Sequence, residues 1–136
     1  MEKITFGVIV SNRNFFPDHL VTEGRRKILV KLEKMKFNTI ILSKEDTSLG
    51  AVETFSDAQR CAQLFKKNSD NIDGIIVILP NFGDEVATTQ AIDMSRLNVP
   101  ILVQACDDDL NKMDLKNRRD SFCGKLSLCN NLYQHN

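Results

Sequence analysis

The chain has 136 residues, of which 42% are hydrophobic and 26% are charged, and this mix is typical of one soluble globular domain spanning 1–136. The formal net charge at pH 7 is zero, which argues against a nucleic-acid partner, because nucleic acids select basic proteins. No apolar run reaches the roughly 20 residues that a membrane-spanning helix needs, so no membrane partner is expected either.

The first expected strand covers 4–10 and follows the N-terminus almost directly. The residues before it lack the basic-then-apolar order of a signal peptide. The sequence therefore predicts a cytoplasmic location, where the four cysteines are expected to be reduced thiols.

Helices and strands are expected to alternate from that point to the end of the chain. Pro17 suits the start of a helix, and Ser56 is expected to be the N-cap of the next one. The apolar run Gly74–Leu79 predicts a strand that is buried on both faces. The expected elements are strands at 4–10, 39–42, 74–79 and 100–104, and helices that begin near 18 and 56 and cover 84–97 and 119–133.

The last helix is predicted from an apolar stripe whose members lie one turn apart, namely Phe122, Leu126, Cys129 and Tyr133. Cys61 falls on a similar stripe of the second helix. We therefore expect Cys61 and Cys129 to be small core residues.

Strands that are apolar on both faces and joined by helical crossovers form parallel sheets covered by helices on each side. Right-handed crossovers then lead to a doubly wound sheet of about four strands in the order 2-1-3-4. The predicted fold class is α/β, a flavodoxin-like or Rossmann-like three-layer sandwich.

In such a sheet ligands bind beyond the carboxyl ends of the strands, where the strand order reverses. The loops at 11–14 and 80–84 follow the first and third strands, so we expect them to face each other. Arg13 can hydrogen-bond hydroxyls or a carboxylate, and Phe82 can pack on the apolar face of a sugar. The alternative is a surface arginine and an aromatic ring folded onto the neighbouring helix. Gln104 is expected one strand further along.

Several other kinds of site are not supported. The glycine patterns of dinucleotide and P-loop nucleotide sites are absent after the first strand. The acidic loop with Asp107, Asp108, Asp109 and Asp114 offers oxygen ligands for a divalent cation, but a solvated loop is the preferred interpretation. We therefore expect no metal site, no cofactor and no catalytic residue in this chain.

The segments "LPNFGDE", "NVPILVQACDDDLNKMD" and "NRRDSFCGKLSLCNNLYQ" resemble the amino-terminal domain of the L-fucose/L-arabinose isomerase-like family. The particular similarity is to its fucose isomerase-like branch. The resemblance implies an aldose-ketose isomerase with long, oligomeric subunits. It also implies manganese or a similar divalent metal, held by two carboxylates and a histidine of later domains.

In this family the amino-terminal domain adds residues to the substrate pocket of a neighbouring subunit. The resemblance therefore implies a sugar partner for Arg13 and Phe82, with Asn81 and Gln104 behind them. We expect a domain of a longer homo-oligomeric protein that is inactive alone. The alternative is a self-standing flavodoxin-like domain that binds a small molecule or regulates, without catalysis.

Overall fold

The computed structural model describes residues 2–135. Within that range four strands and four α-helices alternate, with two short 3-10 turns at Ser48–Gly50 and Ser69–Asn71. The regular elements are β1 (Thr5–Val10), α1 (Asp18–Lys34), β2 (Asn38–Ile41), α2 (Phe55–Lys67), β3 (Gly74–Leu79), α3 (Glu85–Ser95), β4 (Ile101–Ala105) and α4 (Ser121–Gln134).

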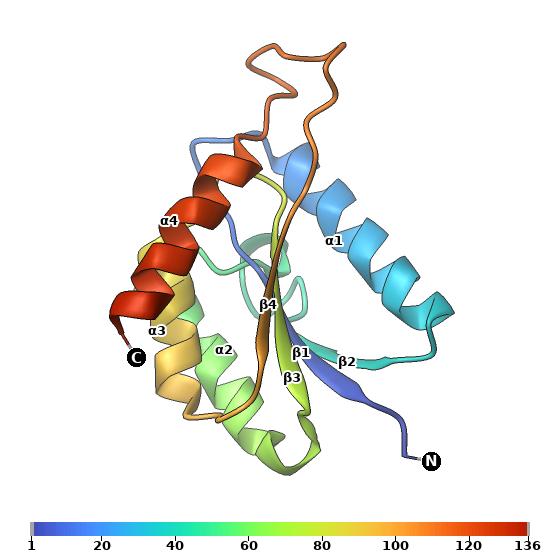
Figure 1. Ribbon diagram of the computed structural model, residues 1–136, viewed down its shortest axis with the longest axis vertical. Helices are drawn as coiled ribbons and strands as arrows, with labels where there is room; N and C mark the ends of the chain where they lie inside the picture. The colour runs from blue at the N-terminus through green and yellow to red at the C-terminus, as the bar shows by residue number, and fades with distance from the viewer. Residues whose placement is uncertain (1, 136) are drawn as a thin grey trace.

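The four strands form one parallel sheet in the order β2-β1-β3-β4 (Figure 1). In the central pair, Ile9 of β1 lies beside Val77 of β3. All six residues of β3 are buried, as expected for a central strand of a parallel sheet covered on both faces. The predicted fold class and strand order are therefore confirmed.

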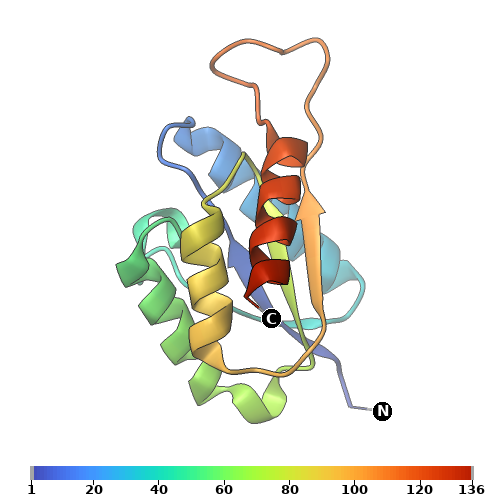
Figure 2. The same cartoon turned by 60° about the vertical axis from the view of Figure 1, so that its left-hand side comes forward.

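Alternating side chains divide the core into two layers. Ile9 and Val77 point to one face, where they pack in a cluster with residues of α2, α3 and α4. Val8 points to the other face, where it shares a cluster with α1 residues such as Val21. Three helices thus cover one face of the sheet and only α1 covers the other (Figure 2).

The start of α2 differs from the prediction. Thr54, and not Ser56, is the N-cap, and its hydroxyl accepts a hydrogen bond of 3.1 Å from the backbone N–H of Asp57. The Asp57 carboxylate accepts a hydrogen bond of the same length from the Thr54 N–H. This reciprocal capping box satisfies two donors at once, which a cap at Ser56 would leave unpaired.

The orientation of α4 also differs from the prediction. The helix exists, but its apolar stripe faces outward: Leu126 is 75% exposed and Cys129 is exposed. The expectation that Cys129 is a core residue is therefore wrong. Gly124 faces inward instead, because a Cβ at that position would lie 1.9 Å from the carbonyl oxygen of Phe82. Cys61 is fully buried, and burial raises the pKa of its thiol to about 12.

The segment between β4 and α4, residues 106–120, projects beyond the carboxyl end of the sheet, and we call it the projecting loop (Figures 1 and 2). Arg119 is buried at its base and donates a hydrogen bond of 2.8 Å to the Pro80 carbonyl. His19 of α1 contacts the Lys116 carbonyl at 2.5 Å. The base of the loop is therefore fixed to both β3 and α1.

Among the helices described, none combines the length and apolar character that crossing a bilayer requires.

Candidate functional site

The loops that follow β1 and β3 meet at the carboxyl end of the sheet, as predicted. The backbone N–H of Ser11 donates a hydrogen bond of 3.0 Å to the Ile78 carbonyl. This bond keeps β1 and β3 paired up to their carboxyl ends. Beyond this point the two loops diverge, and hydrogen bonds from side chains connect them.

Asn81 joins the two loops. Its side chain is fully buried, and its Oδ1 accepts hydrogen bonds from the backbone N–H groups of Arg13 at 3.2 Å and Gly83 at 2.8 Å. Its Nδ2 donates to Asn12 Oδ1 at 2.7 Å. One amide therefore serves donors and acceptors of both loops, as a buried polar group must in order to avoid a desolvation penalty.

Arg13 reaches across from the β1 loop to the β3 loop. Its Nε donates to the Gly83 carbonyl at 2.8 Å, and its Nη2 forms an ion pair of 2.5 Å with Glu85. The guanidinium also lies over the Phe82 ring, 5.0 Å from its centre, within the range of a cation–π contact. About a third of the Arg13 side chain, 36%, remains exposed.

The start of α3 completes the junction. Asp84 is the N-cap, and its carboxylate accepts a hydrogen bond of 2.8 Å from the Ala87 N–H. Ser11 Oγ accepts the Asp84 N–H at 3.0 Å. Gly83 between the loop and the helix has φ of 74°, and a Cβ there would lie 2.6 Å from Ser11 Oγ. This position therefore requires glycine for both its backbone angle and its space.

Glu53 is a member of the site that the sequence reasoning missed. Its carboxylate accepts a hydrogen bond of 2.6 Å from Asn12 Nδ2. Burial raises the pKa of Glu53 above its ordinary value, against the lowering effect of the Asn12 hydrogen bond. Its position follows from a short bridge between Ser11 and Val52. The apolar pair Ala51–Val52 inside a polar segment was the available signal for that bridge.

Gln104 lies apart from these residues. It is an exposed residue of β4, and its Nε2 donates to the carbonyl of Ala105 at 2.9 Å. It lines a groove on the α1 side of the sheet, together with Leu102. The structure thus brings Arg13, Asn81 and Phe82 together but leaves Gln104 outside their network.

This arrangement presents a preformed surface for binding. The Arg13 guanidinium and the half-buried Phe82 ring form what we call the Arg13–Phe82 lip, while Asn81 is enclosed behind it. Among residues 2–135, no cluster of three or more histidine, cysteine or acidic side chains is arranged to hold a metal ion. The guanidinium and the ring of the lip can hydrogen-bond to a ligand and stack on it. That Arg13, Phe82, Asn81 and Gln104 bind substrate stays a prediction.

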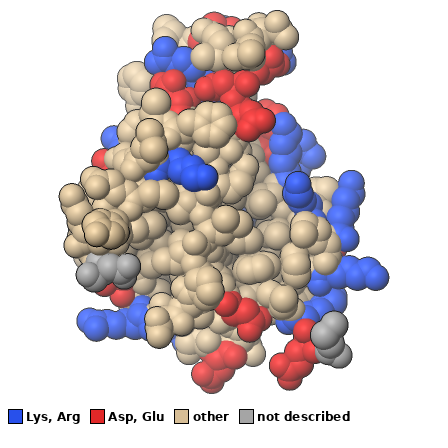
Figure 3. Space-filling model, in the orientation of Figure 1, with Lys and Arg blue, Asp and Glu red and all other residues tan. Residues whose placement is uncertain are grey.

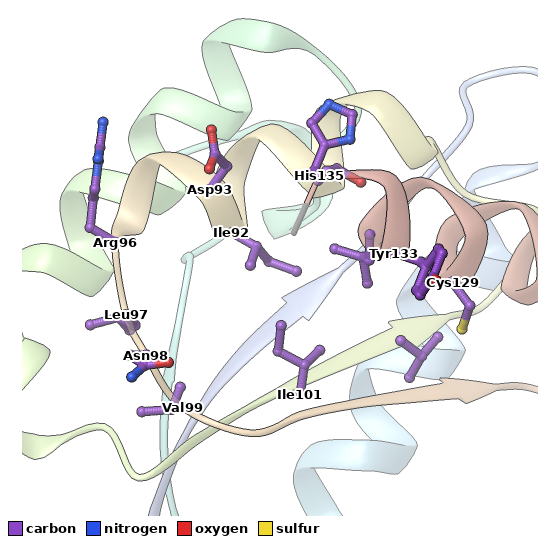
Figure 4. Close-up of a pocket in the computed structure, with 13 residues that line it drawn as sticks. Ile92, Asp93, Arg96, Leu97, Asn98, Val99, Ile101, Cys129, Tyr133 and His135 are labelled. Carbon is purple, nitrogen blue, oxygen red and sulfur yellow. The ribbon is translucent and has the colours of Figure 1, made fainter.

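A separate cavity of about 600 Å³ lies at the other end of the sheet, between α3, α4 and the start of β4 (Figure 4). Ile92, Ile101 and Tyr133 are among its lining residues, and Asp93 and His135 lie at its margin (Figure 4). It is remote from the carboxyl ends of the strands, so it belongs to a different region from the Arg13–Phe82 lip.

Comparison with protein families gave a match over residues 7–136 to the family described as fucose/sulfoquinovose isomerase, N-terminal domain. The match spans nearly the whole chain and agrees with the resemblance of its sequence segments. Arabinose is not part of that description, so this portion of the expectation stays a prediction. Neither the curated proteins nor the solved structures gave a match.

Proposed function

The chain belongs to the fucose/sulfoquinovose isomerase N-terminal domain family, and on that premise we propose that it is the amino-terminal domain of an aldose-ketose isomerase. In this role it supplies contacts between subunits and one wall of a sugar pocket, and it is inactive alone. The observation that carries the proposal is the Arg13–Phe82 lip at the switch point of the sheet.

The lip suits a sugar for two reasons. The Phe82 ring offers an apolar surface for the C–H face of a pyranose, and Arg13 holds N–H donors beside that ring for hydroxyl groups. Glu85 already neutralises the Arg13 guanidinium. A neutral sugar such as fucose therefore fits this lip better than a sulfonated one, which the Glu85 carboxylate would repel.

The metal that the family implies would polarise the substrate carbonyl during isomerisation. Three acidic residues of the projecting loop do not suit that task, because their carboxylates already accept backbone hydrogen bonds that fix the loop. Asp108 accepts from Arg119 at 2.6 Å, Asp109 from Asn111 at 2.9 Å and Asp114 from Lys116 at 2.9 Å. We therefore assign manganese ligands to other domains, and to this chain only the binding and orientation of the sugar.

Two measurements test the proposal. The chain alone, with manganese and fucose, should give no ketose product. When the domain is joined to the remaining domains of a family isomerase, Phe82→Ala should raise KM several-fold with little change in kcat, because it removes binding made before the reaction. Val86→Ala, at an exposed position four residues further along the chain, is the matched control. Unchanged KM in Phe82→Ala, or turnover by the chain alone, would refute the proposal.

The alternative, a self-standing binding or regulatory domain, makes the opposite prediction for the chain alone. A ligand present at a hundredfold excess over its Kd should then stabilise it by about 2.7 kcal/mol. Thermal-shift measurement with neutral and sulfonated sugars separates the two functions, since an incomplete pocket responds weakly.

A further inference from the structure

The side of the sheet covered by α1 is only partly filled. A helix is about 10 Å wide and strands are about 4.8 Å apart, so one helix covers about two of the four strands. A groove of about 540 Å³ remains between α1 and β4, and we call it the α1–β4 groove. Its apolar lining is accessible: Leu102 of β4 is 59% exposed and Met35 at the end of α1 is 53% exposed.

The charges along this groove are mainly positive. Lys27, Lys31 and Arg119 line it, and Asp107 is its acidic residue. Glu23 partly neutralises two of the cations, at 2.8 Å from Lys27 and 3.4 Å from Arg119. Within residues 2–135, Lys31 has no such ion pair, so its ammonium group is available to a carboxylate beside the apolar lining of the groove.

The tip of the projecting loop, residues 108–115, has the complementary character. It contains three aspartates and one lysine. Its two leucine side chains have almost no cover, with Leu110 at 86% and Leu115 at 84% exposure. Two leucines exposed on one projecting segment are typical of an interaction surface.

We propose that the tip of one copy of this chain docks in the α1–β4 groove of a second copy. Leu110 and Leu115 would cover Leu102 and Met35, and the tip carboxylates would approach Lys31. Figure 3 shows both features on one face: acidic residues gather near the projecting loop at the top, basic residues follow α1 at the right, and a largely uncharged surface lies between.

Because tip and groove share a face, a twofold axis between them lets each copy donate its tip to the other. The contact deepens the subunit role in the proposed function and rests on it, but it involves no residue of the Arg13–Phe82 lip. A failure of the tip–groove contact can therefore be distinguished from a failure of the proposed sugar binding, because Arg13→Ala should leave self-association unchanged.

Sedimentation equilibrium of the whole chain tests the proposal with two variants. The tip variant is Leu110→Asp with Leu115→Asp, and the groove variant is Leu102→Asp with Lys31→Glu. Wild type should dimerise, and each variant alone should be monomeric. An equimolar mixture should form a heterodimer that is weaker than the wild-type dimer, because only one of the two contacts is intact, namely the tip of the groove variant in the groove of the tip variant.

Leu126→Asp is the matched control, since Leu126 is 75% exposed on α4 outside both surfaces; it should dimerise like wild type. Should a double variant fail to melt cooperatively, the exposed single changes Lys31→Glu and Asp109→Lys replace it, and each should weaken dimerisation about tenfold. A monomeric wild type, a double or single variant that dimerises as tightly as wild type, or a mixture that associates no more than either double variant alone overturns the proposal.

Discussion

The guanidinium of Arg13 lies 5.0 Å above the centre of the Phe82 ring, while its Nη2 is paired with Glu85. One side chain of the β1 loop thus contacts the ring, the backbone and the first helical residue that follow β3. The candidate sugar-binding surface therefore also holds the loops after β1 and β3 together. Substitutions in it should measurably affect both sugar binding and the free energy of unfolding.

Arg13→Ala should lower the free energy of unfolding by about 1 kcal/mol, the net value of partly exposed hydrogen bonds and ion pairs. Arg13→Lys should restore little of this loss, because an ammonium group cannot bond Gly83 and Glu85 in the planar geometry of a guanidinium. Urea denaturation followed by circular dichroism measures both. Full recovery in the lysine variant would show that charge alone matters at this position.

Gly124→Ala should destabilise the chain by about 1–3 kcal/mol, the usual cost of overpacking. The added Cβ would lie 1.9 Å from the Phe82 carbonyl oxygen, so α4 must shift away from the loop. Lys125→Ala, at the next and exposed position, is the control and should be nearly neutral. Equal stability of the two variants would contradict the close packing of α4.

Glu53→Gln should stabilise the fold at neutral pH. Burial raises the pKa of Glu53 in the folded state, so the folded protein holds this proton more tightly than the unfolded chain does. Stability is therefore lost as the pH rises from the unfolded pKa through the folded one. Melting temperatures of wild type and variant should converge below about pH 4, where the carboxyl is protonated in both states. Glu33→Gln, at an exposed site, should show no such difference.

Arg119→Ala should free the base of the projecting loop. It removes the donor to the Pro80 carbonyl at 2.8 Å and leaves that buried acceptor unpaired, which costs about 1–3 kcal/mol. Amide hydrogen exchange should then accelerate across 106–120 while the central strands keep their protection. Arg118→Ala, the exposed neighbour, should leave exchange unchanged; acceleration in both variants would argue against a specific role for Arg119.

The fold was predictable because its signals are local and repeated. The apolar run Gly74–Leu79 marks a strand buried on both faces, and the alternation of strands with helices leads to the order β2-β1-β3-β4. The meeting of the 11–14 and 80–84 loops followed from that order alone. Local sequence patterns and the rules of sheet topology were therefore sufficient to predict the strand order and the meeting of these two loops.

The missing parts depend on contacts between distant residues. The apolar stripe of α4 suggested a buried face, but the small side chain of Gly124 decides which face packs against Phe82. Glu53 joins the site through the Ser11–Val52 bridge; the apolar pair Ala51–Val52 hints at a bridge but does not specify Ser11 as its partner. Contacts between side chains of segments that are distant in the sequence therefore could not be predicted from local patterns.

The shared hydrogen bonds of Asn81 have a kinetic consequence. Because its amide binds groups of both loops, neither loop can open without breaking the contacts of the other. A ligand arriving at the Arg13–Phe82 lip would meet a rigid template, and little conformational entropy would be lost on binding. Recognition here should depend on the fit of the incoming molecule and on collision frequency, with no slow rearrangement of the loops.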